Sequence, residues 1–144
     1  MFWQEILLTT NDASKNQYSD ECLYSKMILK KDEFPEGRVW TNGNCYDSRY
    51  LGNGCGCAGF AYLMSDVCFG TRKTTFLEEC LDFKVGDVVR FGGYHSMIIL
   101  KVDHKNDIIT ITEGNYGGRI HWGRTFTTEN LKWGCTYIQR RNPN

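Results

Sequence analysis

The sequence is poor in proline and has no excess of charge of either sign. Its 144 residues include two prolines and 15 glycines, and 41% of the residues are apolar. This composition is typical of a turn-rich globular protein and excludes disordered and collagen-like chains. The 17 basic and 17 acidic residues cancel, so the basic surface of a general nucleic-acid-binding protein or of a membrane-surface helix is missing. The length predicts one domain, because two domains would each be too small.

Long apolar runs are missing as well. No stretch of the sequence approaches the roughly 18 apolar residues that a membrane-spanning helix needs. The first ten residues, MFWQEILLTT, lack the basic start of a secretory signal peptide, and Glu5 interrupts their short apolar stretch. We therefore expect either a protein that stays in the cell or one whose leader has been removed.

Cysteine pairs at zinc-binding spacing are also missing. The seven cysteines include no C-x-x-C pair, and Cys55 and Cys57 form a C-x-C without a second pair. We therefore expect no structural zinc, and no other metal or cofactor. The odd number of cysteines leaves at least one thiol free or paired between chains. Without a signal peptide the reduced state is expected, with Cys68 and Cys80 as small core side chains.

Two helices are predicted in the first half of the chain. Ser19 or Asp20 is placed to cap a helix that continues to about Lys31. A second helix is predicted over residues 57–70, because its apolar residues recur at helical spacing and a glycine follows them. The residues on this apolar face are Cys57, Phe60, Ala61, Met64, Val67 and Cys68. The stretch 41–56 is rich in Asn, Gly, Asp and Tyr and is predicted to be irregular loop.

Short segments with strand character follow the second helix. They are rich in Val, Ile, Thr and Tyr, and glycine or polar turns separate them. These segments are Asp87–Phe91, Ser96–Val102, Ile108–Thr112 and Cys135–Arg140. Helices followed by an antiparallel meander predict an α+β fold in which the helices pack on one face of the sheet.

A nucleophile, a base and a polar orienting group stand in that order along the chain. Cys57 is expected at the start of a helix, where free backbone N–H groups favour the thiolate. His95 opens a predicted strand beside a turn, where an imidazole can face a cleft and act as acid and base. Glu113 or Asn115, at the end of the next strand, can hold the imidazole in one orientation. His104 lies in a polar turn and is expected on the surface.

Several sequence segments together resemble the NlpC-like and CHAP superfamily of cysteine amidases and peptidases. GCGCAGF around Cys57 is similar to its nucleophile motif, FKVGDVVRF to the strand before its histidine, and HSMIIL to the strand that the histidine opens. TEGN follows His95 at the spacing of the CHAP pattern. A closer resemblance is to a bacterial subgroup whose motifs read EGRVWTN, GCAGFAYLMSDVCFG and EGNYGGRIHWGRT here. The resemblance covers residues 36–140.

The resemblance implies a papain-like fold, with N-terminal helices packed on an antiparallel sheet. It places the hydrolase domain in residues 36–144 and leaves residues 1–35 as an extension packed on that domain, with no function transferred to it. Cys55, two residues before the nucleophile, is either a redox partner or a rival for the nucleophile. A disulfide between Cys55 and Cys57 is not expected, since it would be strained.

The resemblance also implies the roles of the site residues. Cys57 forms an acyl-enzyme, His95 is its acid and base, Glu113 orients His95, and Asn115 competes with Glu113 or helps it. The backbone N–H of Cys57 is expected to form half of an oxyanion hole. The candidates for the second donor are Tyr46, by analogy with NlpC-like enzymes, and its rivals Asn42, Asn44 and Tyr50. His121, Trp122 and Arg124 either contact substrate or are a packed tryptophan with polar neighbours at the surface.

Peptidoglycan peptides are the commonest substrates implied by the resemblance, so the sequence predicts a cell-wall amidase or endopeptidase. The alternatives are a protease for protein or isopeptide bonds inside the cell, a delivered toxin, a phage-borne enzyme, or an acyl transferase. A peptide-binding module without activity on the same fold is the non-enzyme alternative. A partner protein for targeting is also considered, because the chain is too short for a separate wall-binding domain.

Overall fold

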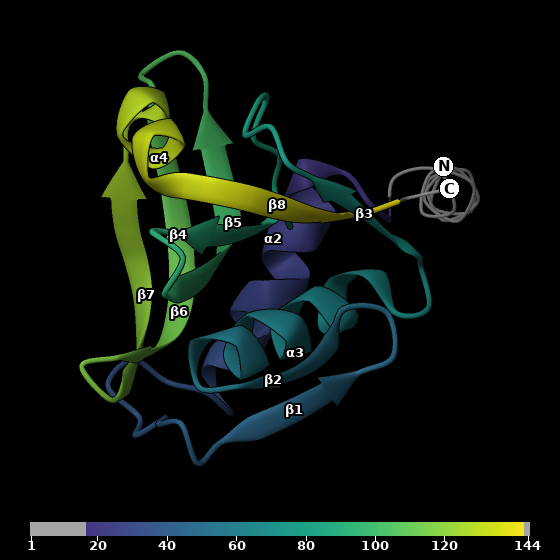
Figure 1. The fold of residues 1–144 in the computed structure, drawn as a ribbon, viewed down its shortest axis with the longest axis vertical. Coiled ribbons are helices and arrows are strands. Elements are labelled where there is room, and N and C mark those ends of the chain that lie inside the picture. Colours follow the sequence, from purple (N-terminus) through teal and green to yellow (C-terminus); the bar gives the residue numbers. More distant parts are fainter. Residues whose placement is uncertain (1–16, 143–144) are drawn as a thin grey trace, which may run out of the picture.

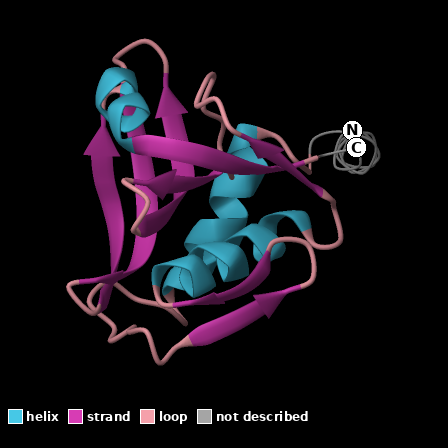
Figure 2. Cartoon of the chain, in the orientation of Figure 1, coloured by secondary structure: helices cyan, strands magenta, loops and turns pink. Residues whose placement is uncertain are grey.

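The computed structural model describes residues 17–142, which form an α+β structure built on a six-stranded antiparallel sheet (Figures 1 and 2). The strand order in this sheet is β3-β8-β4-β5-β6-β7, and a separate hairpin pairs β1 with β2. The bounds of the sheet strands are Thr74–Leu77 for β3, Val88–Phe91 for β4, His95–Asp103 for β5, Ile108–Tyr116 for β6, Arg119–Phe126 for β7 and Cys135–Arg141 for β8.

Both predicted helices are present. Helix α2 spans Asp20–Ile28 and continues into a 3-10 turn, η1, over Leu29–Lys31. Its cap is Ser19, whose Oγ accepts a hydrogen bond from the Cys22 N–H at 3.3 Å. Helix α3 spans Cys57–Phe69 and ends at Gly70, which has a positive φ of 56°. The sequence did not predict helix α4, Thr128–Gly134, which begins after the cap Thr127.

The prediction of irregular loop over residues 41–56 is wrong. Strands β1, Cys45–Ser48, and β2, Gly52–Cys55, pair as an antiparallel hairpin in this stretch. Glycine and asparagine have low strand propensity, so the composition concealed the pairing. Helix α3 lies between this hairpin and the large sheet (Figure 1).

The four predicted strands correspond to β4, β5, β6 and β8, and β6 extends beyond its predicted end. Strands β3 and β7, at the two edges of the sheet, were not predicted. Consecutive side chains of the central strands point to opposite faces, so the sheet has a core on each side. Ile98 packs with Phe60 and Met64 under the helices, whereas Ile99 packs with Leu131 of α4 on the other face.

The sequence analysis places residues 1–35 outside the family pattern. The structure describes residues 17–35 of this segment. Leu23 and Met27 of α2 and the following Phe34 are buried in the same core as Phe60 of α3. This part of the extension therefore packs on the rest of the chain and supplies core side chains. Residues 1–16 lie outside the described residues.

The expectation of reduced cysteines is wrong for four of the seven. Cys45 is bonded to Cys55 and Cys80 to Cys135, which leaves free thiols at Cys22, Cys57 and Cys68. Cys55 is thus neither a nucleophile nor a redox partner of Cys57. Cys80 is buried as expected, but as half of a disulfide. The hairpin pairing brings the Cα atoms of Cys45 and Cys55 to 3.9 Å, a proximity that the sequence does not show.

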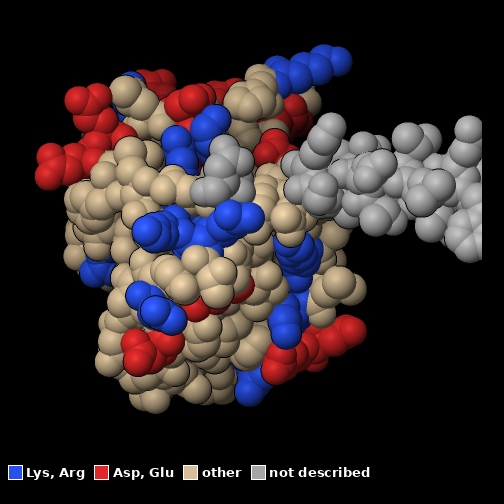
Figure 3. All heavy atoms as spheres, turned by 90° about the vertical axis from the view of Figure 1, so that its right-hand side faces the viewer, with Lys and Arg blue, Asp and Glu red and all other residues tan. Residues whose placement is uncertain are grey.

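The face of the molecule shown in Figure 3 carries charges of both signs. Basic and acidic side chains both occur on the face shown in Figure 3, so neither sign covers it.

Cys68 is buried as predicted, and burial raises the pKa of its thiol to about 12. None of the helices within residues 17–142 has the length and apolar character needed to cross a membrane.

Candidate active site

Helix α3 presents Cys57 as its first residue, directly after Gly56. Gly56 has a φ of 63°, and a Cβ at this position would lie 2.5 Å from Asn42 Oδ1, so only glycine fits the turn. Trp40 Nε1 donates to the Gly56 carbonyl at 2.8 Å and holds the turn in place. The backbone N–H of Cys57 belongs to the first helical turn, which has no intrahelical acceptor. This N–H group is therefore available to an oxyanion.

The imidazole of His95 lies between Cys57 and Glu113. His95 begins β5 after a turn through Gly92 and Gly93, both with positive φ. Its Nε2 is 2.8 Å from Glu113 Oε1, and the Cys57 thiol is close enough to the ring to raise the pKa of the imidazole. Since Glu113 occupies Nε2, Nδ1 is the nitrogen left for the thiol. The side chain of Glu113 is fully buried, and that of His95 is 9% exposed.

Arg124 of β7 completes this chain of contacts. Its Nε donates to Glu113 Oε2 at 2.9 Å and its Nη2 to Oε1 at 2.6 Å. The guanidinium also lies over the rings of Tyr116, at 4.4 Å, and Phe126, at 4.9 Å. The sequence analysis left Arg124 between surface and substrate contact. The structure places it against the buried carboxylate, as a counter-charge, and also among the residues that line the hollow at Cys57.

The environment of the site favours charged forms of its groups. Burial alone would raise the pKa of the Cys57 thiol, but hydrogen bonds from His95 and the Ser96 backbone outweigh it. With the charges of His95 and Arg90, they lower the Cys57 pKa from 9.0 to about 7. Burial lowers the pKa of His95, yet its hydrogen bonds with Cys57 and Glu113 leave that pKa raised. The site can therefore hold a thiolate and an imidazolium together near neutral pH.

Neighbouring groups also determine the pKa of the buried Glu113 carboxylate. Burial would raise the pKa of Glu113, but hydrogen bonds from His95 and Arg124 and the charge of Arg124 lower it below its ordinary value. Glu113 therefore stays ionised and can stabilise a positively charged imidazole. The four side chains form one chain of contacts from the thiol to Arg124.

Asn115 and Asn42 also line the site. Asn115 Nδ2 donates to Asn42 Oδ1 at 3.0 Å, and Asn115 has a positive φ of 52°. No hydrogen bond joins Asn115 to His95 within residues 17–142, so Glu113 alone of the two candidates contacts the imidazole. The side-chain nitrogen of Asn42 makes no hydrogen bond to the described residues. Of the four proposed oxyanion donors, Asn42 is the one that lines the hollow at Cys57.

A hollow of about 410 Å³ opens at the thiol. Aromatic side chains from the turn before His95 and from the end of β6 surround it together with the polar groups. The lining residues are Asn42, Cys57, Phe91, Tyr94, His95, Asn115, Tyr116 and Arg124. Tyr94 is 73% and Tyr116 43% exposed. Sequence reasoning did not single out these aromatic residues, because an exposed tyrosine in a turn has no distinctive local pattern.

The other proposed oxyanion donors do not line this hollow. The Tyr46 hydroxyl donates to Asp66 Oδ2 at 2.7 Å, and burial and this acidic partner raise the pKa of Tyr46 to about 12. Asn44 Oδ1 accepts from the Thr41 N–H, and the Tyr50 carbonyl accepts from Thr74. The assignment of Tyr46 as oxyanion donor is therefore corrected, since β1 directs it toward the far part of α3.

His121 and Trp122 are not among the lining residues either. His121 Nδ1 is 2.6 Å from Glu36 Oε2, and Trp122 Nε1 donates to the Phe34 carbonyl at 2.8 Å. The Trp122 ring meets Phe60 edge-on in the core. The packed interpretation of Trp122 thus holds, and the proposed substrate contact by these two residues is corrected.

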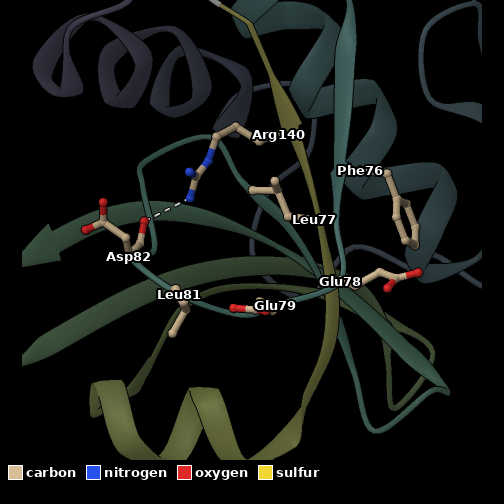
Figure 4. Close-up of a pocket in the computed structure, with 7 residues that line it drawn as sticks. All are labelled: Phe76, Leu77, Glu78, Glu79, Leu81, Asp82 and Arg140. Carbon is tan, nitrogen blue, oxygen red and sulfur yellow. Dashed lines mark hydrogen bonds between the residues drawn. The ribbon is translucent and has the colours of Figure 1, made fainter.

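A larger hollow, of about 660 Å³, lies away from the thiol beside β3 (Figure 4). Its lining residues are Phe76, Leu77, Glu78, Glu79, Leu81, Asp82 and Arg140. Arg140 donates to the Asp82 carbonyl and forms an ion pair with Asp87. The lining contains no cysteine or histidine, so the arrangement of thiol and imidazole at Cys57 is not repeated in this hollow.

Comparisons with known proteins do not identify the site. No family model and no curated protein matches the sequence. A solved structure described as "The crystal structure of Ly7917" is 22% identical over 53% of this chain, with a TM-score of 0.43. The match spans about a third (34%) of that chain. A likeness at this level carries no argument, so function is argued from the geometry of the site.

Proposed function

We propose that the protein is a cysteine-dependent amide hydrolase with a papain-like fold of the NlpC and CHAP type. The observation that carries the proposal is the unbroken chain of contacts from Cys57 through His95 and Glu113 to Arg124. A thiol at a helix start, an imidazole and a buried carboxylate are the three parts of a cysteine hydrolase site. The sequence motifs around Cys57, His95 and Glu113 support the same family.

In the first half of the proposed reaction, the Cys57 thiolate attacks the carbonyl carbon of an amide. The carbonyl oxygen becomes an oxyanion, which accepts hydrogen bonds from the Cys57 backbone N–H and the Asn42 side-chain nitrogen. The protonated imidazole of His95 then gives its Nδ1 proton to the amide nitrogen. The C–N bond breaks, the amine leaves, and the acyl group remains on the sulfur as a thioester.

In the second half, the now neutral imidazole of His95 takes a proton from a water molecule. The resulting hydroxide adds to the thioester carbonyl, the C–S bond breaks, and the acid leaves. The thiolate and imidazolium are restored, and no proton is gained or lost by the enzyme in the complete cycle. Glu113 stabilises the imidazolium in the resting enzyme and fixes the orientation of the ring.

We propose peptidoglycan peptides as the substrate, because they are the commonest substrates of the family that the motifs resemble. Protein or isopeptide bonds remain the alternative, as does transfer of the acyl group to an amine instead of water. An inactive peptide-binding module is less well supported, since such a module does not need the lowered pKa of Cys57.

The test is digestion of purified sacculi and, separately, of protein conjugates, with cleaved bonds identified by mass spectrometry. We expect the wild type to release fragments from one of these substrates. Cys57→Ala should release none, and Cys22→Ala, which removes another free thiol, should behave like the wild type. Fragment release by Cys57→Ala would refute the proposal. So would a Cys57 thiol that reacts with iodoacetamide no faster than free cysteine at pH 7.

A further inference from the structure

A positively charged group without an acidic partner lies beside the Cys57 thiol. Nη1 of Arg90 is 3.9 Å from Cys57 Sγ and donates to Ser96 Oγ at 3.0 Å. Nη2 donates to the Gly93 carbonyl at 2.9 Å. The Ser96 hydroxyl and the Gly93 carbonyl are neutral acceptors. Within residues 17–142 no carboxylate forms an ion pair with Arg90.

Other arginines that the fold holds by several hydrogen bonds do have an acidic partner. The pairs are Arg124 with Glu113, Arg140 with Asp87, and Arg141 with Asp66. Arg90 is held by hydrogen bonds to two neutral acceptors, and its charge is not neutralised by any carboxylate of the described residues. No hydrogen bond to these residues uses its Nε, which leaves this donor for a ligand. Arg90 is half-buried and reaches the edge of the site through its contact with the Cys57 thiol, although it is not among the residues that line the hollow.

The strand order places Arg90 next to the strands that carry His95 and Glu113. Arg90 lies on β4, directly opposite Ser96 of β5 and Tyr137 of β8. His95 and Glu113 lie on β5 and β6, on the other side of β4 from β8. A substrate that runs across these strands over the thiol therefore passes both the imidazole and the guanidinium.

When the charges of the site are counted, the positive charge of Arg90 has no negative charge to balance it. The Glu113 carboxylate and the Cys57 thiolate balance the Arg124 guanidinium and the His95 imidazolium. When the thiolate becomes a thioester, Arg90 loses the one anionic group near it. A carboxylate on the substrate neutralises this excess positive charge, and a guanidinium binds a carboxylate through parallel N–H donors.

We propose that Arg90 binds a free carboxylate of the substrate, so that the enzyme acts on amides whose acyl or amine residue carries a carboxylate close to the scissile bond. This inference rests on the proposed cysteine chemistry and adds the chemical class of the substrate. The short distance from Arg90 to Sγ requires the carboxylate to lie within a few bonds of the reacting carbonyl.

Iodoacetate and iodoacetamide provide a matched pair of probes. Each alkylates a thiolate, forming an S–C bond and releasing iodide, but iodoacetate carries a carboxylate where iodoacetamide carries a neutral amide. Both react with the same thiolate, so the ratio of the two rates at one pH does not depend on the thiolate fraction. A change in the pKa of Cys57 therefore leaves the ratio unchanged, whereas loss of an anion-binding group lowers it.

We expect the iodoacetate to iodoacetamide rate ratio at Cys57 to exceed that of free cysteine. Arg90→Gln should lower the ratio about tenfold, as expected for loss of a charge about 4 Å away. Arg90→Lys, which keeps the charge without the planar fork, should lose less. Arg49→Gln removes an exposed arginine from the turn between β1 and β2 and should leave the ratio as in the wild type.

An unchanged ratio in a folded Arg90→Gln variant would overturn the proposal. If that variant does not fold, Arg90→Met and Arg90→Lys replace it, and equal ratios in these two variants would overturn the proposal as well. Failure of the proposed function has a different signature. In that case iodoacetamide itself reacts with Cys57 no faster than with free cysteine, whatever residue occupies position 90.

Discussion

Arg124 donates two hydrogen bonds to the carboxylate of Glu113, at 2.9 Å from Nε and 2.6 Å from Nη2. The carboxylate is fully buried, and the arginine side chain is 31% exposed. Glu113 also contacts His95. Arg124 lies on β7 and Glu113 on β6, so the buried carboxylate receives its counter-charge from a neighbouring strand. Without it, burial would favour the protonated form of Glu113, which cannot stabilise an imidazolium.

Arg124→Met tests this relationship. The variant leaves Glu113 buried with one partner fewer, and we expect it to lower the free energy of unfolding by about 3 kcal/mol in urea denaturation. It should also raise the pKa of Cys57, because a protonated Glu113 no longer stabilises the imidazolium. Arg49→Met is the control for loss of an arginine. A stable Arg124→Met variant with an unchanged thiol pKa would contradict the positioning role.

The pKa of Cys57 is expected to be measurable from the ultraviolet absorbance of its thiolate in a Cys22→Ser background. Because the pKa is lowered, the thiolate should persist as pH falls from 9 and be half protonated at pH about 7. His95→Ala removes the main partner of the thiol, so the midpoint should move toward 9.0 or above. The Cys57→Ser spectrum supplies the baseline. A wild-type midpoint near 9 would show that the pair does not form.

Asn42→Ala separates oxyanion binding from thiol activation. Removing one oxyanion donor costs about 10²–10³ in kcat for acyl-transfer enzymes, and we expect a loss of this size in fragment release from the substrate identified above. Alkylation of Cys57 by iodoacetamide forms no oxyanion and should keep its rate. Asn53→Ala, at an exposed position in β2, is the control. Parallel loss of both activities would indicate a structural role for Asn42.

The disulfides predict a thiol count and two different losses of stability. Titration of the unfolded protein should find three free thiols before reduction, because Cys45–Cys55 and Cys80–Cys135 are bonded. The bridges close loops with sequence separations of 10 and 55 residues. Chain entropy then predicts losses of about 2–3 kcal/mol for Cys45→Ser/Cys55→Ser and about 4 kcal/mol for Cys80→Ser/Cys135→Ser in urea denaturation. Five or more free thiols would contradict this pairing.

Local sequence patterns predicted the helices and the central strands. The bounds of α3 followed from apolar residues at helical spacing and from Gly70, and the cap of α2 followed from Ser19. Edge strands β3 and β7 escaped prediction because their burial pattern is weak. The β1–β2 hairpin escaped because paired backbone groups and a disulfide stabilise residues of low strand propensity.

The sequence by itself determined that this is a single α+β chain with Cys57 at a helix start and His95 at a strand start. These features depend on neighbouring residues, whose spacing and propensity act over a few positions of the chain. Only the tertiary structure decided that Glu113 contacts His95, that Arg124 pairs with Glu113, that Arg90 lies beside the thiol, and that four cysteines are bonded. Each of these contacts joins residues from different elements of the fold, and the strand order, register and helix packing fix such distances, which no local pattern encodes.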